Sequence, residues 1–68
     1  DAAKAEEVKI NQRIAELDAQ VKQLHQQLEA TTDEAETKRI NDECMKLYRE
    51  TNQCLRRIGA PESQMYDI

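Results

Sequence analysis

The sequence contains 68 residues, and its 14 acidic side chains against 10 basic ones give a net charge of −4. A chain of this length has room for one small domain and seldom builds a core that is comfortably stable alone. An acidic chain is a poor candidate for nucleic-acid binding, which depends on neutralising phosphates with Lys and Arg. No apolar run approaches the roughly 20 residues needed to span a bilayer. We therefore expect neither a nucleic acid nor a membrane as a partner.

The composition favours long helices. Phe and Trp are absent, there is one Gly and one Pro, and 35% of the residues are charged. Such a composition is typical of coiled coils, although a charged and weakly hydrophobic chain can also be disordered. Disorder would not maintain a regular apolar stripe, and residues 6–58 carry one. The sequence therefore predicts an all-α fold.

The first stripe lies in the amino-terminal half, where apolar residues recur at alternating spacings of four and three. Its members are Ile10, Ile14, Leu17, Val21, Leu24 and Leu28. Two apolar residues in every seven form the seam of a coiled coil. Residues 1–9 are good helix formers with acids near the start. The pattern predicts a first helix over about residues 3–30.

A turn is expected at residues 31–33. Thr31, Thr32 and Asp33 interrupt the stripe with short polar side chains, and Thr31 followed by Glu34 has the spacing of a capping box. We predict that a second helix begins at Glu34 and continues to about residue 58. The alternative is a single unbroken helix, because neither Gly nor Pro interrupts this region.

The second stripe repeats the spacing of the first and has the same length. Its members are Ile40, Cys44, Leu47, Thr51, Cys54 and Ile58. On one continuous helix the two stripes would lie about 120° apart, whereas a chain reversal brings them face to face. Leu28 then lies opposite Ile40, and Ile10 opposite Ile58. Residues 1–58 are therefore predicted to form a two-helix antiparallel coiled-coil hairpin.

In this register Arg13 would face Arg57, a like-charge pair. Two helices alone also cannot bury both stripes completely. We expect the hairpin to be completed by a partner protein or by self-association.

The second helix carries further apolar residues beside its stripe. Tyr48 and Leu55 are predicted on one flank and Met45 on the other, while the corresponding flank of the first helix is polar. This asymmetry indicates helix 2 as the contact surface for a partner or for a homo-oligomer. Alternatively, these residues merely widen the core of the hairpin.

Gly59 and Pro61 should end the second helix and leave residues 59–68 as a C-terminal extension. Met65 and Tyr66 in this extension could fold back over the hairpin or insert into a groove of a partner, or the extension could be disordered. The complete set of candidate partner-binding residues is Met45, Tyr48, Leu55, Arg56, Arg57, Met65 and Tyr66.

No motif that carries catalytic chemistry is present. His25 is the only histidine and has the pattern of a solvated helix-edge residue, since a zinc site needs three or four ligands. Cys44 and Cys54 have no general base nearby in the sequence. We expect no catalytic residues, no metal and no cofactor, and hence no enzymatic activity.

The two cysteines lie ten residues apart, or about 15 Å along a helix, which is too far for a disulfide. Free thiols suit a reducing compartment, the cytoplasm or nucleus. The first residue is Asp1 rather than Met, which suits a processed product or a fragment of a longer protein.

The sequence thus predicts a non-enzymatic protein–protein interaction module. It would dock on a partner protein or associate with itself. The alternative is an architectural spacer or oligomerisation segment of a larger coiled-coil protein.

Overall fold

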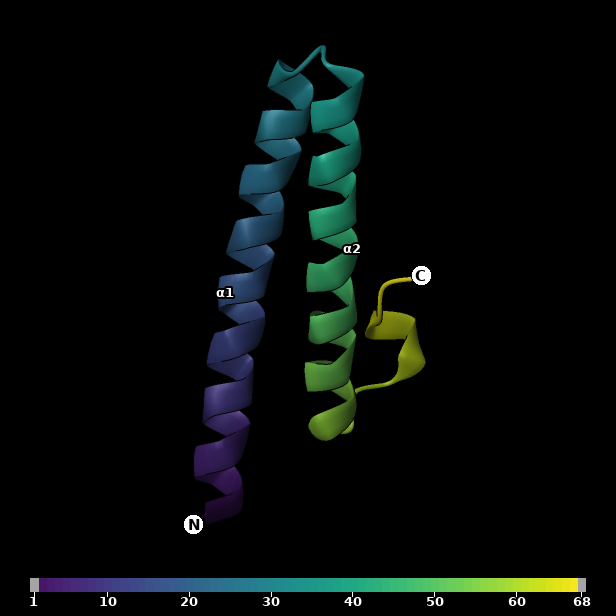
Figure 1. The fold of residues 1–68 in the computed structure, drawn as a ribbon. Coiled ribbons are helices and arrows are strands. Elements are labelled where there is room, and N and C mark those ends of the chain that lie inside the picture. Colours follow the sequence, from purple (N-terminus) through teal and green to yellow (C-terminus); the bar gives the residue numbers. More distant parts are fainter. Residues whose placement is uncertain (1, 68) are drawn as a thin grey trace.

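The computed structural model describes residues 2–67. Two long helices, α1 (Ala2–Ala30) and α2 (Glu34–Arg57), are followed by a short 3-10 helix, η1 (Glu62–Gln64). The long helices pack side by side and run in opposite directions, as Figure 1 shows. Residues 2–67 contain no strand. The predicted all-α antiparallel two-helix hairpin is confirmed, and the molecule is a rod of 49 × 19 × 14 Å.

The core of the hairpin lies along the two predicted stripes. The buried members of the stripes are Leu17, Val21, Leu24, Ile40, Cys44 and Thr51. Leu24, Ile40 and Cys44 form one cluster, against which Leu28 and Leu47 pack. These neighbours agree with the layers that the register predicts near the turn, where Leu28 meets Ile40 and Leu24 meets Cys44.

The turn differs from the prediction at its cap. Asp33, not Thr31, caps α2: its carboxylate accepts a hydrogen bond from the Ala35 N–H at 3.0 Å. Because α2 begins at Glu34, only the residue just before it can reach the free amides of the first turn. Thr31 instead accepts a bond from the Asp33 N–H at 3.3 Å and so supports the turn.

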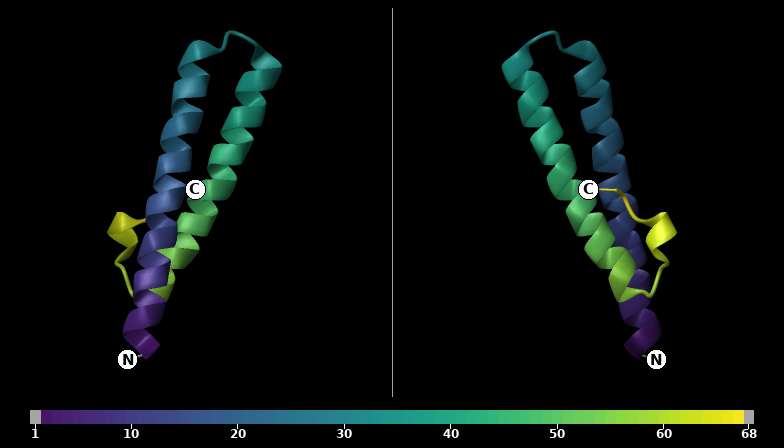
Figure 2. Two further views of the ribbon diagram at one scale, coloured as in Figure 1. Left: turned by 90° about the vertical axis from the view of Figure 1, so that its left-hand side faces the viewer. Right: turned by 90° about the vertical axis from the view of Figure 1, so that its right-hand side faces the viewer.

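The end of α2 is a Schellman motif. Gly59 has a φ of +76°, and its N–H donates to the Arg56 carbonyl while the Ala60 N–H donates to the Leu55 carbonyl. A positive φ is readily adopted by glycine alone, so Gly59 permits the chain to reverse here. Residues 59–67 then run back along the outer side of α2, away from α1 (Figures 1 and 2). Of the alternatives left open by the sequence, the structure shows the segment folded back.

No helix within residues 2–67 is both long enough and apolar enough to cross a bilayer.

Candidate interaction surface

Asn52 fixes the returning C-terminal segment to α2. Its side-chain NH₂ donates to the Tyr66 carbonyl oxygen at 3.0 Å, and its side-chain oxygen accepts from the Tyr66 N–H at 2.8 Å. Asn52 is buried, so both ends of its amide need partners, and the main chain of one residue supplies them. This is the hydrogen-bonding pattern that a neighbouring strand would offer to an extended chain.

Tyr48 holds the side chain of the same residue. The rings of Tyr48 and Tyr66 stack with centroids 4.2 Å apart and an interplanar angle of 24°. The Tyr48 hydroxyl lies 2.9 Å from Nε2 of His25 on α1. Tyr48 on α2 therefore contacts both α1 and the C-terminal segment. Burial raises the pKa of the Tyr48 phenol above its ordinary value.

The structure brings several of the predicted partner-binding residues together. Arg56, Met65 and Tyr66 line one hollow between α2 and the C-terminal segment, and Tyr48 contacts Tyr66 beside it. Arg57 does not line this hollow; together with Ile10 it lines a separate one at the open end of the hairpin. The tyrosines of α2 and of the C-terminal segment therefore belong to one composite surface.

Met45 and Leu55 lie on the same helix as Tyr48. The prediction that Met45 lies on the opposite flank is wrong, because residues three apart on a helix are neighbours and Met45 precedes Tyr48 by three. Met45 is 37% exposed, and Leu55 is half-buried. Met45 thus extends the apolar surface beyond the tyrosine pair.

Two residues of this surface have no distinctive signal in the sequence. Asn52 follows Tyr48 by four residues and so shares its side of α2, but a polar residue there is also what a solvated flank contains. His25 was predicted as a solvated edge residue, and it is exposed, yet it bonds Tyr48.

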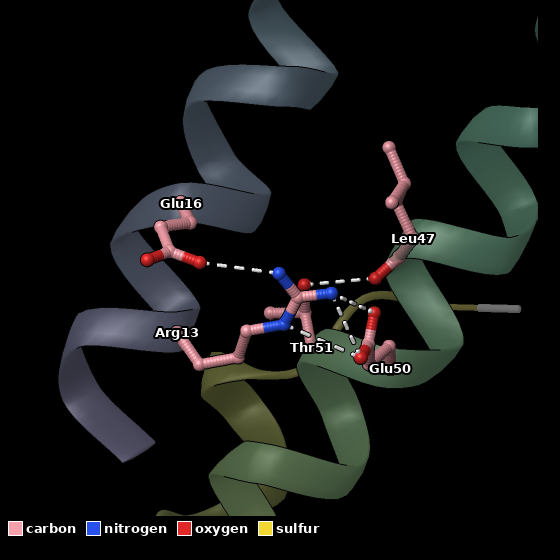
Figure 3. Close-up of polar contacts among 5 residues, drawn as sticks. All are labelled: Arg13, Glu16, Leu47, Glu50 and Thr51. Atoms are coloured by element: carbon pink, nitrogen blue, oxygen red, sulfur yellow. Dashed lines mark hydrogen bonds and ion pairs between the residues drawn. The ribbon is translucent and has the colours of Figure 1, made fainter. Parts of the chain in front are cut away.

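The opposite edge of the hairpin carries an ion pair between the helices. Nη2 of Arg13 lies 3.0 Å from both carboxylate oxygens of Glu50, and Nη1 donates to Glu16 at 3.1 Å (Figure 3). These hydrogen bonds raise the pKa of Arg13, the one to Glu50 most. Figure 3 also shows Thr51, whose buried hydroxyl donates to the Leu47 carbonyl at 2.8 Å.

This pair corrects the prediction that Arg13 meets Arg57. Glu50 lies one heptad before Arg57 on the same edge of α2, and the long Arg13 side chain reaches it diagonally. Arg13 therefore has an attractive partner on α2 in place of the predicted like-charge one.

The core of the hairpin is incompletely buried. Half of the twelve stripe positions are only half-buried, namely Ile10, Ile14, Leu28, Leu47, Cys54 and Ile58. Two hollows expose parts of the seam: one is lined by Leu24 and Leu47 among glutamines, the other by Ile10 and Cys54 among charged residues. Apolar surface remains accessible after the two helices have closed on each other.

The Cys44 thiol has an environment that does not activate it. Burial, with a smaller contribution from the charge of Glu43, raises the pKa of the Cys44 thiol, and a reactive cysteine needs the opposite shift. Cys54 is a half-buried free thiol. Within residues 2–67, no group of three His, Cys, Asp or Glu side chains is placed to hold a metal ion.

The fold and the surface together define an antiparallel helical hairpin with a clasped C-terminal segment. No family model matches the sequence, and comparisons with curated proteins and with solved structures find no significant match.

Proposed function

We propose that this chain is a non-enzymatic protein–protein interaction module whose hairpin completes its core against another helical surface. The observation that carries this proposal is the half-buried state of six stripe residues in a hairpin that has already closed. In a complete helical bundle such positions are enclosed by neighbouring helices. Removal of this apolar surface from water is the favourable contribution that would offset the freedom lost on association.

The edge that carries Arg13 and Glu50 suits this contact. Leu24 and Leu47 are flanked there by Gln20, Gln27 and Lys46. An apolar centre with an uncharged or mixed polar rim is the usual organisation of an interface. The amphipathic face of a helix, with apolar residues at intervals of three and four, has the shape that such a shallow groove accepts.

A second copy of the hairpin is the simplest helical surface that could complete the core, because a pair of hairpins forms a four-helix bundle. Self-association is tested by sedimentation equilibrium and by thermal melting over about a hundredfold range of concentration, since the melting midpoint of an oligomer rises with concentration. We expect a dimer whose midpoint rises. A monomer that melts cooperatively at a constant midpoint would contradict self-association.

A matched pair of variants locates the contact. Gln20→Glu places a charge beside the Leu24 and Leu47 hollow, whereas Gln26→Glu makes the same change away from it on α1. Removing a carboxylate from water at an interface is costly even beside a lysine such as Lys46, so we expect Gln20→Glu to weaken association by about tenfold and Gln26→Glu to leave it unchanged. Equal effects of the two variants would contradict this placement of the interface. Far-UV circular dichroism checks that both variants remain helical.

The elongated shape of 49 × 19 × 14 Å supports an architectural spacer as the alternative function. A spacer would hold two parts of a larger protein apart and would not need the exposed apolar edge. It predicts that neither glutamine variant changes association.

A further inference from the structure

We propose that the site on α2 formed by Tyr48 and Asn52, here called the tail site, also accepts the C-terminal segment of a second copy of this chain, so that two molecules exchange their tails. The tail is the segment of residues 59–67. This inference goes beyond the proposed function, because it does not involve the half-buried seam.

The contacts of the tail site do not depend on whether the tail belongs to the same chain. Asn52 bonds both main-chain groups of Tyr66, and Tyr48 stacks on its ring. Met65, just before Tyr66, has the extended conformation that presents these groups, with φ −88° and ψ 154°. None of these contacts involves residues 59–61, the part of the tail that directly follows α2. An identical segment from another molecule can therefore make the same contacts.

The direction of the tail is compatible with exchange. Within one chain the tail runs antiparallel to α2 because the chain reverses at Gly59 (Figures 1 and 2). If the reversal opens, the tail continues in the direction of its own α2. A second molecule placed end to end, with its α2 in the opposite direction, then receives that tail antiparallel to its own α2. Exchange of identical elements in this way preserves the contacts of the tail site and gives up only the hydrogen bonds of the reversal at Gly59.

Gly59 controls the balance between the closed and the exchanged forms. Its φ of +76° belongs to the closed reversal, and a β-carbon at this position would meet no atom within 4 Å. The substitution Gly59→Ala therefore penalises the reversal through the backbone alone, without a clash. Left-handed backbone costs a non-glycine residue roughly 1–2 kcal/mol, which disfavours the closed form by about tenfold. The effective concentration of a tethered tail is of order millimolar, so exchange in the wild type should appear near that concentration.

The test uses full-length chains. Isotope-labelled and unlabelled protein are mixed in equal amounts, and isotope-filtered nuclear Overhauser spectra detect contacts between Tyr48 of one molecule and Tyr66 of another. We expect such contacts at about millimolar concentration in the wild type, and at a roughly hundredfold lower concentration in Gly59→Ala, because each exchanged pair relieves two left-handed residues. Contacts confined to single molecules in both proteins would overturn the proposal. Dimers that form through the seam would give concentration-dependent melting without these contacts, so the two proposals fail separately.

A second measurement covers the case of weak dimers. A synthetic peptide with the sequence of residues 61–68 is titrated into the full chain carrying Tyr66→Ala, whose own tail has lost its ring. We expect the amide resonances of Tyr48 and Asn52 to shift. The further substitution Asn52→Ala should reduce the affinity at least about fivefold, since it removes two hydrogen bonds. Equal binding by a peptide of scrambled sequence would overturn the proposal.

Discussion

Arg13 and Glu50 join the two helices of the hairpin by a bidentate ion pair, with Nη2 of the guanidinium 3.0 Å from each carboxylate oxygen. Both side chains are 42% exposed, so water and salt weaken their attraction considerably. The pair therefore adds little to the stability of the hairpin, although its two-point geometry restricts how far the helices can slide along each other.

The first prediction concerns this ion pair. A double-mutant cycle of Arg13→Ala and Glu50→Ala should show a small favourable coupling that declines as salt is added, measured by thermal unfolding. Each single variant should lower the melting midpoint by only a few degrees. The same cycle with Arg57→Ala in place of Glu50→Ala is the control and should show no favourable coupling. A repulsive coupling between Arg13 and Arg57 would mean that the two arginines face each other after all.

The second prediction concerns the centre of the core. Leu17 is 0% exposed, so Leu17→Ala should destabilise the hairpin by about 2–5 kcal/mol, enough to unfold a domain of marginal stability. Val8 on the same helix is 54% exposed, and Val8→Ala should change stability by less than about 0.5 kcal/mol. Urea unfolding followed by circular dichroism measures both. Similar losses for the two variants would show that Leu17 does not lie in a closed core.

The third prediction distinguishes the observed helix cap from the one that the sequence pattern suggests. Asp33→Ala removes the acceptor of the Ala35 N–H and should cost about 1 kcal/mol. Thr31→Ala removes only the longer bond to the Asp33 N–H and should cost less. Thermal unfolding of the two variants under the same conditions gives the comparison. The reverse order would restore Thr31 as the cap.

The fourth prediction is a loss of stability in alkali. Burial raises the pKa of Cys44 above its ordinary 9.0 and that of Tyr48 above its ordinary 10.0. The unfolded chain then releases these protons at a lower pH than the folded chain does, so stability falls as pH rises through the ordinary values and stops falling above the folded-state values. Urea midpoints measured from about pH 7 to about pH 11 should show this decline.

A variant separates the two contributions to this decline. Cys44→Ala should flatten its earlier part, which the thiol causes, and leave the later part, which the phenol causes. A stability that does not depend on pH in the wild type would contradict the burial of both groups. Only the slopes are compared, because Cys44→Ala also leaves a small void that lowers stability at every pH.

The fifth prediction concerns thiol reactivity. Cys54 is half-buried, whereas Cys44 is 4% exposed and its pKa is raised. Since the thiolate is the reacting species, iodoacetamide should modify Cys54 first in the folded protein. Mass spectrometry of proteolytic fragments locates the label. In denaturant the two rates should become similar, and a persistent difference there would show that the fold is not its cause.

The hairpin was predictable because its information lies in the periodicity of the sequence. Stripes at alternating spacings of four and three specify helices with apolar seams, and the phase shift between Leu28 and Ile40 specifies the reversal. The layers near the turn follow from that register. The positions of the helices and their register are set by the repeated apolar residues and depend little on any single side chain.

The tail site could not be predicted in the same way. Asn52 has a definite role only once a main chain lies against it, and the path of that main chain depends on the local geometry at Gly59. The partner of Arg13 was also missed, because a long side chain can choose among several neighbours that the backbone register leaves equivalent.

The two stacked tyrosines supply an intrinsic spectroscopic reporter. They are the only Tyr residues of a sequence without Trp or Phe, so the aromatic ultraviolet signal of the protein comes from Tyr48 and Tyr66 alone. Coupling between such close chromophores should produce near-ultraviolet dichroism that disappears when the rings separate. The docked and undocked states could thus be followed optically in unlabelled protein.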